Sequence, residues 1–281
     1  MGKIENIIKD TIKRDFENGV IEGILGFEQD DYSKDGIITF IDSIDNIDNL
    51  IWNDYCINNL SKYLIEETKS NKKIGILLKG CDSLGFEQLI SDNRINKENI
   101  KTYGIPCNGM KNSLTDELYK KCKTCNNKNP KNCDEFLGEP VEITLKERFH
   151  EVYKIEQMTS DDKYDFWMNE FKKCIRCNAC KNVCPACNCE TCVFENKDED
   201  ILGKANNESE TGFYQIIRAY HVAGRCSDCG ECERVCPVGI QLSLLNQKLI
   251  KDSQELYGDG DVLSTFNLED EDTFLDKKGG K

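Results

Sequence analysis

The feature that most constrains this chain is a cysteine run that occurs twice. In each copy, three cysteines stand three residues apart, and a fourth follows four residues later, directly before a proline. The first copy consists of Cys174, Cys177, Cys180 and Cys184. The second copy consists of Cys226, Cys229, Cys232 and Cys236. Three thiols on one tight loop can bind three corners of a cubane, whereas zinc usually takes two plus two ligands.

Disulfide bonds do not explain these cysteines. The chain has 17 cysteines in 281 residues, which is an odd number, and no basic segment followed by an apolar run opens it. A protein of this length also builds a core without covalent staples. We therefore expect a protein of the reducing cytoplasm.

Charge and hydropathy exclude two further classes. The formal net charge is -14, so the chain lacks the basic balance of a nucleic-acid-binding protein. No apolar stretch approaches the roughly 20 residues of a membrane span. With two histidines in the sequence, we expect no catalysis by imidazole. An acidic surface favours protein partners.

The repeated spacing is that of bacterial ferredoxins with two [4Fe-4S] clusters, in which the fourth cysteine of each run binds the cluster of the other run. This rule predicts crossed ligand sets. One cluster takes Cys174, Cys177, Cys180 and Cys236. The other takes Cys226, Cys229, Cys232 and Cys184. Apolar residues at helical spacing in 213–225 and 240–250, and a helix over 160–173 with a Ser N-cap, predict that helices wrap this ferredoxin-like core.

The first half of the chain predicts an α/β domain. A buried strand at 72–80 leads into a helix through Cys81, and a second strand at 100–106 ends at Cys107, before a predicted helix over 113–122. The carboxyl ends of such strands are where open α/β sheets bind ligands. A helix over residues 3–16 and strands at 20–27 and 36–42 complete the scaffold. The fold class is therefore an α/β domain followed by a helix-wrapped α+β dicluster ferredoxin-like domain.

A second group of thiols belongs to this α/β domain. Cys122 and Cys125 form a C-x2-C pair, which together with the single cysteines 81 and 107 makes four possible ligands. From spacing alone, these four thiols fit zinc, a redox disulfide or a third [4Fe-4S] cluster.

Several segments resemble the beta-subunit family of coenzyme F420-reducing hydrogenases and formate dehydrogenases. The segments KGCDS, GIPCNGM and KCKTCNNKNPKNCDEFLGEP are similar to the signature loops of that family. The two cysteine runs are similar to the dicluster module of its bacterial formate-dehydrogenase-type members. The resemblance implies a [4Fe-4S] cluster at Cys81, Cys107, Cys122 and Cys125, and a role in moving electrons within a larger anaerobic redox complex.

The resemblance by itself does not decide whether the protein binds a flavin. Deazaflavin-using members carry their ferredoxin module at the N-terminus and a Gly-Gly segment associated with FAD. Here the module follows the α/β domain, the Gly-Gly pair is Gly279–Gly280, and the sequence has no G-x-G-x-x-G. The sequence therefore favours a protein without FAD. A flavoenzyme subunit that exchanges hydride with a nicotinamide or deazaflavin is the alternative, and a zinc-binding interaction protein is a third reading.

Five cysteines lie outside these three sets. Cys187, Cys189 and Cys192 follow the first run directly, and a fourth cluster would need one more ligand, for which Cys56 on a predicted helix over 50–64 is the candidate. Packing thiols are the other reading of these four residues, and for Cys133 packing is the expectation.

The domain boundaries follow from these motifs. We expect an α/β domain at 1–158, a dicluster domain at 159–252 and an acidic tail at 253–281 that is solvated or docks on a partner. The predicted function is an electron-transfer subunit that relays single electrons between a catalytic partner and a second acceptor, such as a soluble ferredoxin. Formate dehydrogenase, hydrogenase or a heterodisulfide-reductase-like protein are the candidate partners.

Overall fold

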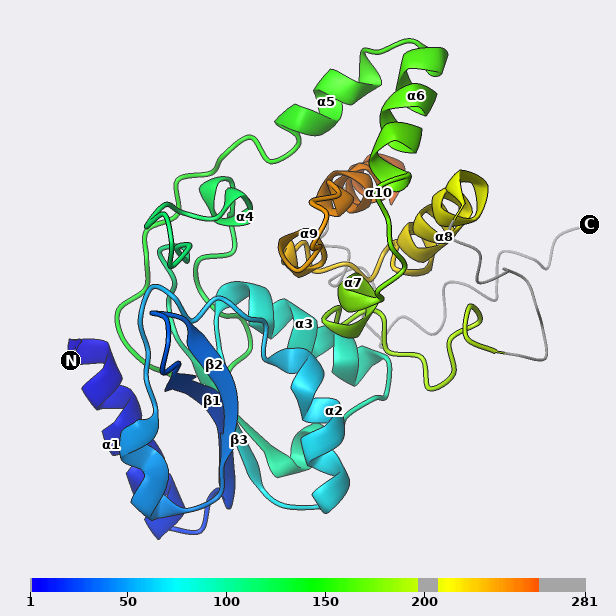
Figure 1. Cartoon of the computed structure of the whole chain (residues 1–281). Coiled ribbons are helices and arrows are strands. Elements are labelled where there is room, and N and C mark those ends of the chain that lie inside the picture. Colours follow the sequence, from blue (N-terminus) through cyan, green and yellow to red (C-terminus); the bar gives the residue numbers. More distant parts are fainter. Residues whose placement is uncertain (1, 197–206, 258–281) are drawn as a thin grey trace, which may run out of the picture.

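The computed structural model describes residues 2–196 and 207–257. A five-stranded sheet with the strand order β2-β1-β3-β4-β5 forms one end of the molecule (Figure 1). Its strands are β1 Gly23–Gln29, β2 Gly36–Ile41, β3 Ile74–Leu78, β4 Ile100–Gly104 and β5 Glu135–Phe136. The β1–β2 pair is antiparallel and the other three pairs are parallel. The predicted α/β sheet is therefore confirmed, with strands close to the expected positions.

The centre of the sheet is apolar on both faces. Every residue of β3 is buried, as expected for a strand with parallel neighbours and helices on both sides. Helix α1 (Lys3–Glu17) covers one face, and helices α2 (Leu64–Glu67) and α3 (Gly80–Ser91) cover the other (Figure 1). Short 3-10 helices connect these elements at Ile44–Asn49, Ser61–Tyr63, Thr68–Ser70 and Lys97–Asn99. We call this part, residues 3–137, the sheet region.

The second part of the chain is helical. Its longer helices are α5 His150–Glu156, α6 Ser160–Phe171, α8 Glu208–His221 and α10 Leu242–Tyr257, and its four-residue helices are α7 Ala179–Asn182 and α9 Glu231–Arg234. Helix α8 begins at a good cap, because the Asn207 side chain accepts a hydrogen bond from the Glu210 amide at 2.9 Å. Its first turn is acidic and its last turn contains Arg218 and His221, which suits the helix dipole.

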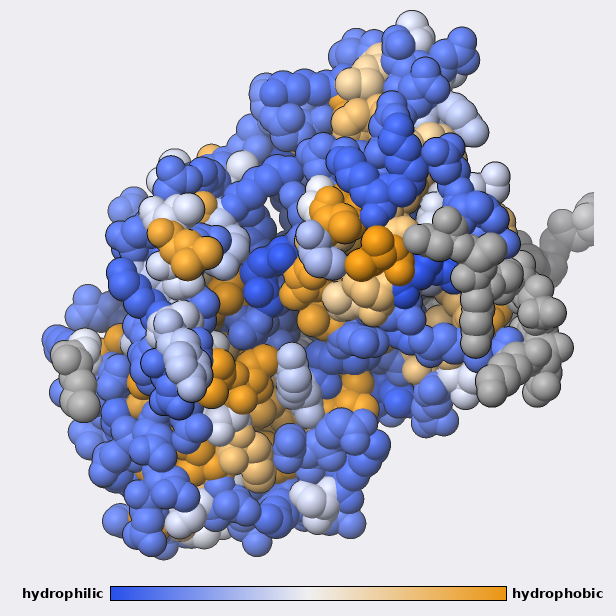
Figure 2. Space-filling view, in the orientation of Figure 1, coloured by the Kyte–Doolittle hydropathy of each residue, from blue (hydrophilic) through white to orange (hydrophobic). Residues whose placement is uncertain are grey.

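The two parts touch along α3. Gly85 on this helix faces Pro185, which follows the first cysteine run, so closely that a Cβ would come within 2.9 Å of the proline ring. At the end of the helix, Asp92 pairs with Arg225 at 2.6 Å, just before the second run. Because of these two contacts, both cysteine runs lie against the sheet region. In Figure 2, most of the visible face is hydrophilic, and apolar side chains gather near its middle.

Two predicted helices are wrong. Residues 50–60 are irregular up to the 3-10 helix at Ser61, because the Asn53 side chain accepts a hydrogen bond from the Tyr55 amide and closes a turn instead. Residues 113–119 also turn, since the Asn112 side chain accepts hydrogen bonds from the next amides, and only α4, Lys120–Lys123, is helical there. In both places a side chain replaces the helical hydrogen bond.

The start of α6 is also corrected. The N-cap is Thr159 rather than Ser160, and its hydroxyl oxygen accepts a hydrogen bond from the Asp162 amide at 3.2 Å. The acidic tail was expected from residue 253, but α10 extends to Tyr257. The rest of the tail, and residues 197–206 of the polar stretch between the runs, lie outside the described residues. Within 2–196 and 207–257, no helix is long and apolar enough to cross a membrane.

Candidate functional site

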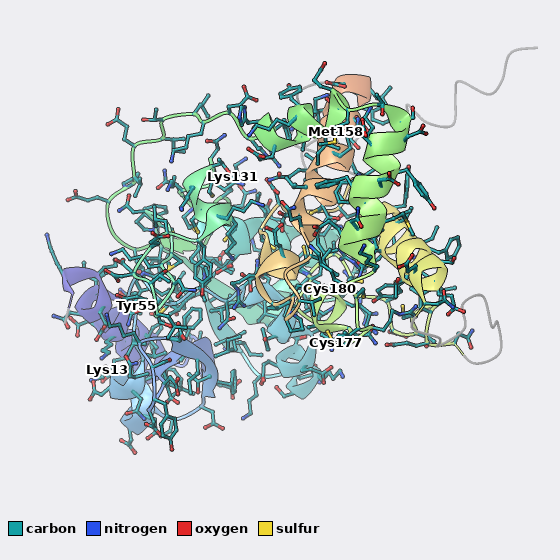
Figure 3. All side chains as sticks on the ribbon, turned by 45° about the horizontal axis from the view of Figure 1, so that its top comes forward. Lys13, Tyr55, Lys131, Met158, Cys177 and Cys180 are labelled. Carbon is teal, nitrogen blue, oxygen red and sulfur yellow. The ribbon has the colours of Figure 1, made fainter. Side chains whose placement is uncertain are left out.

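The cysteines of the first run line a hollow together with the last cysteine of the second run. These four residues, which we call the first-run set, are Cys174, Cys177, Cys180 and Cys236. Apolar side chains such as Ile240 and Leu242 complete the wall of this hollow. Cys177 is exposed, whereas Cys174 and Cys180 are buried. Figure 3 shows Cys177 and Cys180 beside each other, far from Lys13 on α1.

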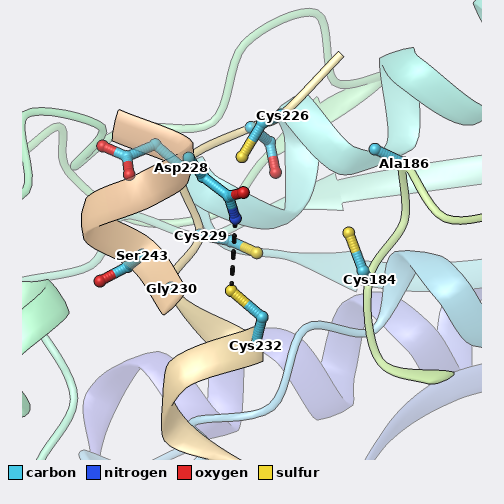
Figure 4. A pocket seen from close by; sticks show the side chains of 10 residues that line it. Cys184, Ala186, Cys226, Asp228, Cys229, Gly230, Cys232 and Ser243 are labelled. Carbon is cyan, nitrogen blue, oxygen red and sulfur yellow. Dashed lines mark hydrogen bonds between the residues drawn. The ribbon is translucent and has the colours of Figure 1, made fainter. Parts of the chain in front are cut away.

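The second run forms a matching hollow with the last cysteine of the first run. This second-run set consists of Cys184, Cys226, Cys229 and Cys232 (Figure 4). The structure thus brings together the same two groups of four that the crossed rule of dicluster ferredoxins predicts.

The two runs have the same backbone conformation. In each run, the residue before the second cysteine and the residue after it adopt a left-handed conformation: Arg176 and Asn178 in the first, Asp228 and Gly230 in the second. A four-residue helix, α7 or α9, then carries the third cysteine, and a turn leads to the fourth. This repeat explains why three thiols of each run face one centre.

Each of these two sets receives hydrogen bonds at sulfur. The Gln215 side chain on α8 donates to Cys174 Sγ at 3.3 Å, and the Asn246 side chain on α10 donates to Cys232 Sγ at 3.5 Å. The second of these bonds is the dashed line in Figure 4. A backbone amide also donates to Cys236 Sγ at 3.4 Å. Donors of this kind stabilise thiolates and the metal groups that thiolates bind.

A third set lies at the carboxyl ends of β3 and β4. This sheet-end set consists of Cys81, Cys107, Cys122 and Cys125, which line one hollow. Cys81 lies in the first turn of α3, one residue after Gly80, where a Cβ would come within 2.2 Å of the Asn127 carbonyl oxygen. Backbone amides donate to Cys107 and Cys122, both at 3.3 Å.

Buried lysines accompany the sheet-end set. Lys79 and Lys121 both line its hollow. Lys79 Nζ lies 2.8 Å from an Asp82 carboxylate oxygen, and both side chains are almost fully buried. Burial raises the pKa of the Cys81 thiol well above its ordinary value, so this thiol is neutral unless a cation or metal binds it. Four thiols beside buried cations suit an anionic metal–thiolate group.

A charged triad joins the sheet-end set to the second-run set. Lys121 and Arg234 both pair with the buried carboxylate of Glu231, the latter at 2.6 Å. Burial alone would raise the pKa of Glu231, but Lys121 and Arg234 hold it down at about 2. Lys121 interacts electrostatically with Cys81 on one side and with Cys229 on the other.

The remaining cysteines do not form one group. Cys56 lies in the core of the sheet region, where its thiol contacts Asn53, and burial raises its pKa to about 11. Cys187 instead lies near Cys184 and Cys192, and its carbonyl oxygen accepts a hydrogen bond from Lys62 at 2.5 Å. Cys189 is exposed. Cys133 lies beside Gly104, where a Cβ would come within 2.5 Å of its sulfur, as expected for a packing thiol. The fourth ligand suggested for the 187–192 segment is therefore not beside it.

Sequence reasoning missed the polar side chains around the sets. Gln215 and Arg218 occupy the buried face of α8, and Glu231 occupies the start of α9. A signal was present for the first two, because polar residues at helical spacing on an otherwise apolar face indicate buried partners. In the described residues, no three His, Cys, Asp or Glu side chains were found grouped as ligands of a single metal ion.

Comparison with known proteins shows what this chain is similar to. A family described as a 4Fe-4S dicluster domain matches residues 170–240. The F420-dependent formate dehydrogenase subunit beta of Methanocaldococcus jannaschii is 21% identical over 89% of this chain and 91% of its own length. The F420-dependent formate dehydrogenase 1 subunit beta of Methanococcus maripaludis is 20% identical over 74% of this chain and 77% of its own length. Along most of its length the chain is therefore similar to beta subunits of F420-dependent formate dehydrogenases, and it is an iron-sulfur electron-transfer subunit with a 4Fe-4S dicluster domain.

Proposed function

We propose that this subunit holds three [4Fe-4S] clusters, one in each of the first-run, second-run and sheet-end sets. The observation that carries the proposal is the presence of three separate hollows, each with four cysteines in its lining. Bound there, the clusters would accept and release single electrons. The cysteines would serve as ligands, and the side chains around them would set the reduction potentials.

The order of the three sets follows from the charged residues between them. Lys121 reaches thiols of the sheet-end and second-run sets, and Arg218 reaches thiols of the second-run and first-run sets. The second-run set is therefore the middle one. The first-run set, with its exposed Cys177, is the end that faces solvent or a partner.

The names of the relatives suggest which proteins exchange electrons with the two ends of this row of three sets. Their names describe beta subunits of F420-dependent formate dehydrogenases, so we propose that the catalytic partner here oxidises formate or carries out a related two-electron reaction. Hydrogenase and heterodisulfide-reductase-like partners fit the same relay. A soluble ferredoxin is the proposed second acceptor.

The domain boundaries proposed from the sequence, 1–158, 159–252 and 253–281, suit this arrangement. Several contacts cross the first boundary, and on α5 Glu156 pairs with Lys248 at 2.8 Å and with Lys251 at 3.1 Å, both on α10. Helix α5 thus connects the two parts and packs on the second.

A flavin-containing subunit is the second candidate, because the named relatives are F420-dependent and align over most of the chain. The close contact at Gly80 favours the flavin-free proposal. Asn127 fills the space beside this glycine, so its lack of a side chain serves loop packing rather than a pyrophosphate.

Metal and flavin analysis of anaerobically purified protein tests both candidates. We expect about twelve irons per chain, from four per cluster, and well under one flavin released by acid. Cys81→Ser should lower the iron content by about four. Stoichiometric zinc in the sheet-end set would contradict the third cluster. Near-stoichiometric FAD, with reduction of the clusters by a deazaflavin donor, would favour the flavoenzyme.

A further inference from the structure

Among the residues that the structure describes, Arg218 is the largest fully buried side chain. It lies on α8 between the two cysteine runs and is 1% exposed. Its Nε donates a hydrogen bond to Gln215 Oε1 at 3.3 Å. In the part of the chain that the structure describes, neither of its two terminal nitrogens has a hydrogen-bond partner.

Burial of such a guanidinium costs free energy. Arginine keeps its proton at all accessible pH values, so it cannot become neutral as a buried lysine can. A buried charge is tolerated only when an opposite charge compensates it. The buried lysines 79 and 121 have carboxylate partners, Asp82 and Glu231. Among residues 2–196 and 207–257, no carboxylate pairs with Arg218.

The neighbours of Arg218 are thiols of both ferredoxin-type sets. Its guanidinium interacts electrostatically with Cys232, Cys180 and Cys184. Cys180 belongs to the first-run set, whereas Cys184 and Cys232 belong to the second-run set. Gln215 extends the contact, since it accepts from Arg218 and donates to Cys174 of the first-run set.

We propose that Arg218 is a positioning residue that acts as the shared counter-charge of the first-run and second-run sets. The inference rests on the proposed function, because anionic groups bound by these thiols take the place of the missing carboxylate. Reduction of either set by one electron adds one negative charge, and the fixed cation stabilises that charge without any proton transfer. The potentials of both sets should therefore depend on the same side chain.

The test compares Arg218→Met with Arg218→Lys in the full-length protein, purified anaerobically. Dithionite supplies the electrons, and electron paramagnetic resonance follows the midpoint potential of each set. We expect Arg218→Met to lower the potentials of both the first-run and second-run sets and to speed iron loss to a chelator severalfold. Arg218→Lys, which keeps the charge, should stay close to wild type, and the sheet-end set should not move in either variant.

Arg14→Met is the matched control. It removes one guanidinium from α1, where the side chain pairs with Glu135 near the surface. In Figure 1, α1 lies at the far end of the molecule from helices α6, α8 and α10. An equal shift in this control would mean that net charge alone acts, and the proposal fails. It also fails when Arg218→Met moves neither set or only one.

A variant that loses its clusters also tests the proposal. If Arg218→Met binds no iron in the two runs while Arg218→Lys does, the charge requirement is supported. If both variants lose the same iron, the shape of arginine matters and its charge does not, which overturns the inference. Iron measured first in the wild-type protein separates these results from a failure of the proposed function, which would show as wild-type protein without clusters.

Discussion

The first-run and second-run sets have the same local structure but different surroundings. Both combine a loop with two left-handed residues, a four-residue helix and one cysteine from the other run. The first-run set has the exposed Cys177, and the nearby Glu195 pairs with Lys181 near the surface. The second-run set has the buried Glu231, paired with Lys121 from the sheet region and with Arg234. The spacing of a run therefore decides how its cysteines are placed, and long-range packing decides the electrostatics around them.

Because of this difference, nearby charges act on the two sets with different strength. A group in water-accessible surroundings is screened, whereas fixed charges in a buried site act strongly on any neighbouring charge. The second-run set is thus the one whose properties the sheet region can influence directly. Four tests of this comparison follow, in order of decreasing effect.

Removal of the crossed ligand should have the largest effect. In Cys184→Ala, we expect the second-run set to lose its cluster, about four irons, although the substituted residue lies in the first run. The electron paramagnetic resonance spectrum of the reduced protein should also lose the magnetic coupling between two neighbouring clusters. Cys133→Ala is the control and should keep all iron. A coupled spectrum in Cys184→Ala would reject the crossed arrangement.

Loss of the buried carboxylate should come next. Glu231→Gln leaves Lys121 and Arg234 without their shared partner, and breaking a buried ion pair costs roughly 3–5 kcal/mol. Urea unfolding of the anaerobic protein should show this loss. The matched variant on the first-run side is Glu195→Gln, whose side chain is 49% exposed, and its effect should lie within about 1 kcal/mol. Equal losses in the two variants would remove the electrostatic contrast between the sets.

The two side-chain amides at sulfur provide a smaller and more selective test. Gln215→Leu removes the donor to Cys174, and Asn246→Leu removes the donor to Cys232. Each bond contributes about 1 kcal/mol, which corresponds to about 40 mV for one electron. We expect each variant to lower mainly the potential of its own set in a redox titration. A variant that shifts the opposite set more would show that the hydrogen bonds do not act locally.

The extra thiols should have the smallest effect. The structure separates Cys56 from the 187–192 segment, so we expect the double variant Cys189→Ala, Cys192→Ala to retain its iron and visible spectrum. Iron analysis decides this directly. A fall of about four irons would instead reveal a fourth cluster beside the first run.

Sequence reasoning was most successful where the signal was local. The strands at β3 and β4 and the helices α1, α6, α8 and α10 lie close to the expected residues, because their apolar periodicity is strong. It failed over 50–60 and 113–119, where Asn53 and Asn112 close turns with their side chains. A single polar side chain outweighed the helical pattern in these segments, and periodicity does not detect such competition.

The sequence by itself determined which cysteines of the two runs come together. Cysteine spacing fixes the loop, and the repetition of the run predicts which fourth cysteine joins it. Tertiary structure alone decided what surrounds each set. Arg234 contacts Asn58 across 176 residues of chain at 2.5 Å, and Lys121 reaches Glu231 across 110 residues. Contacts of such separation depend on how the helices pack on the sheet, so no local pattern predicts which charges become buried beside which thiols.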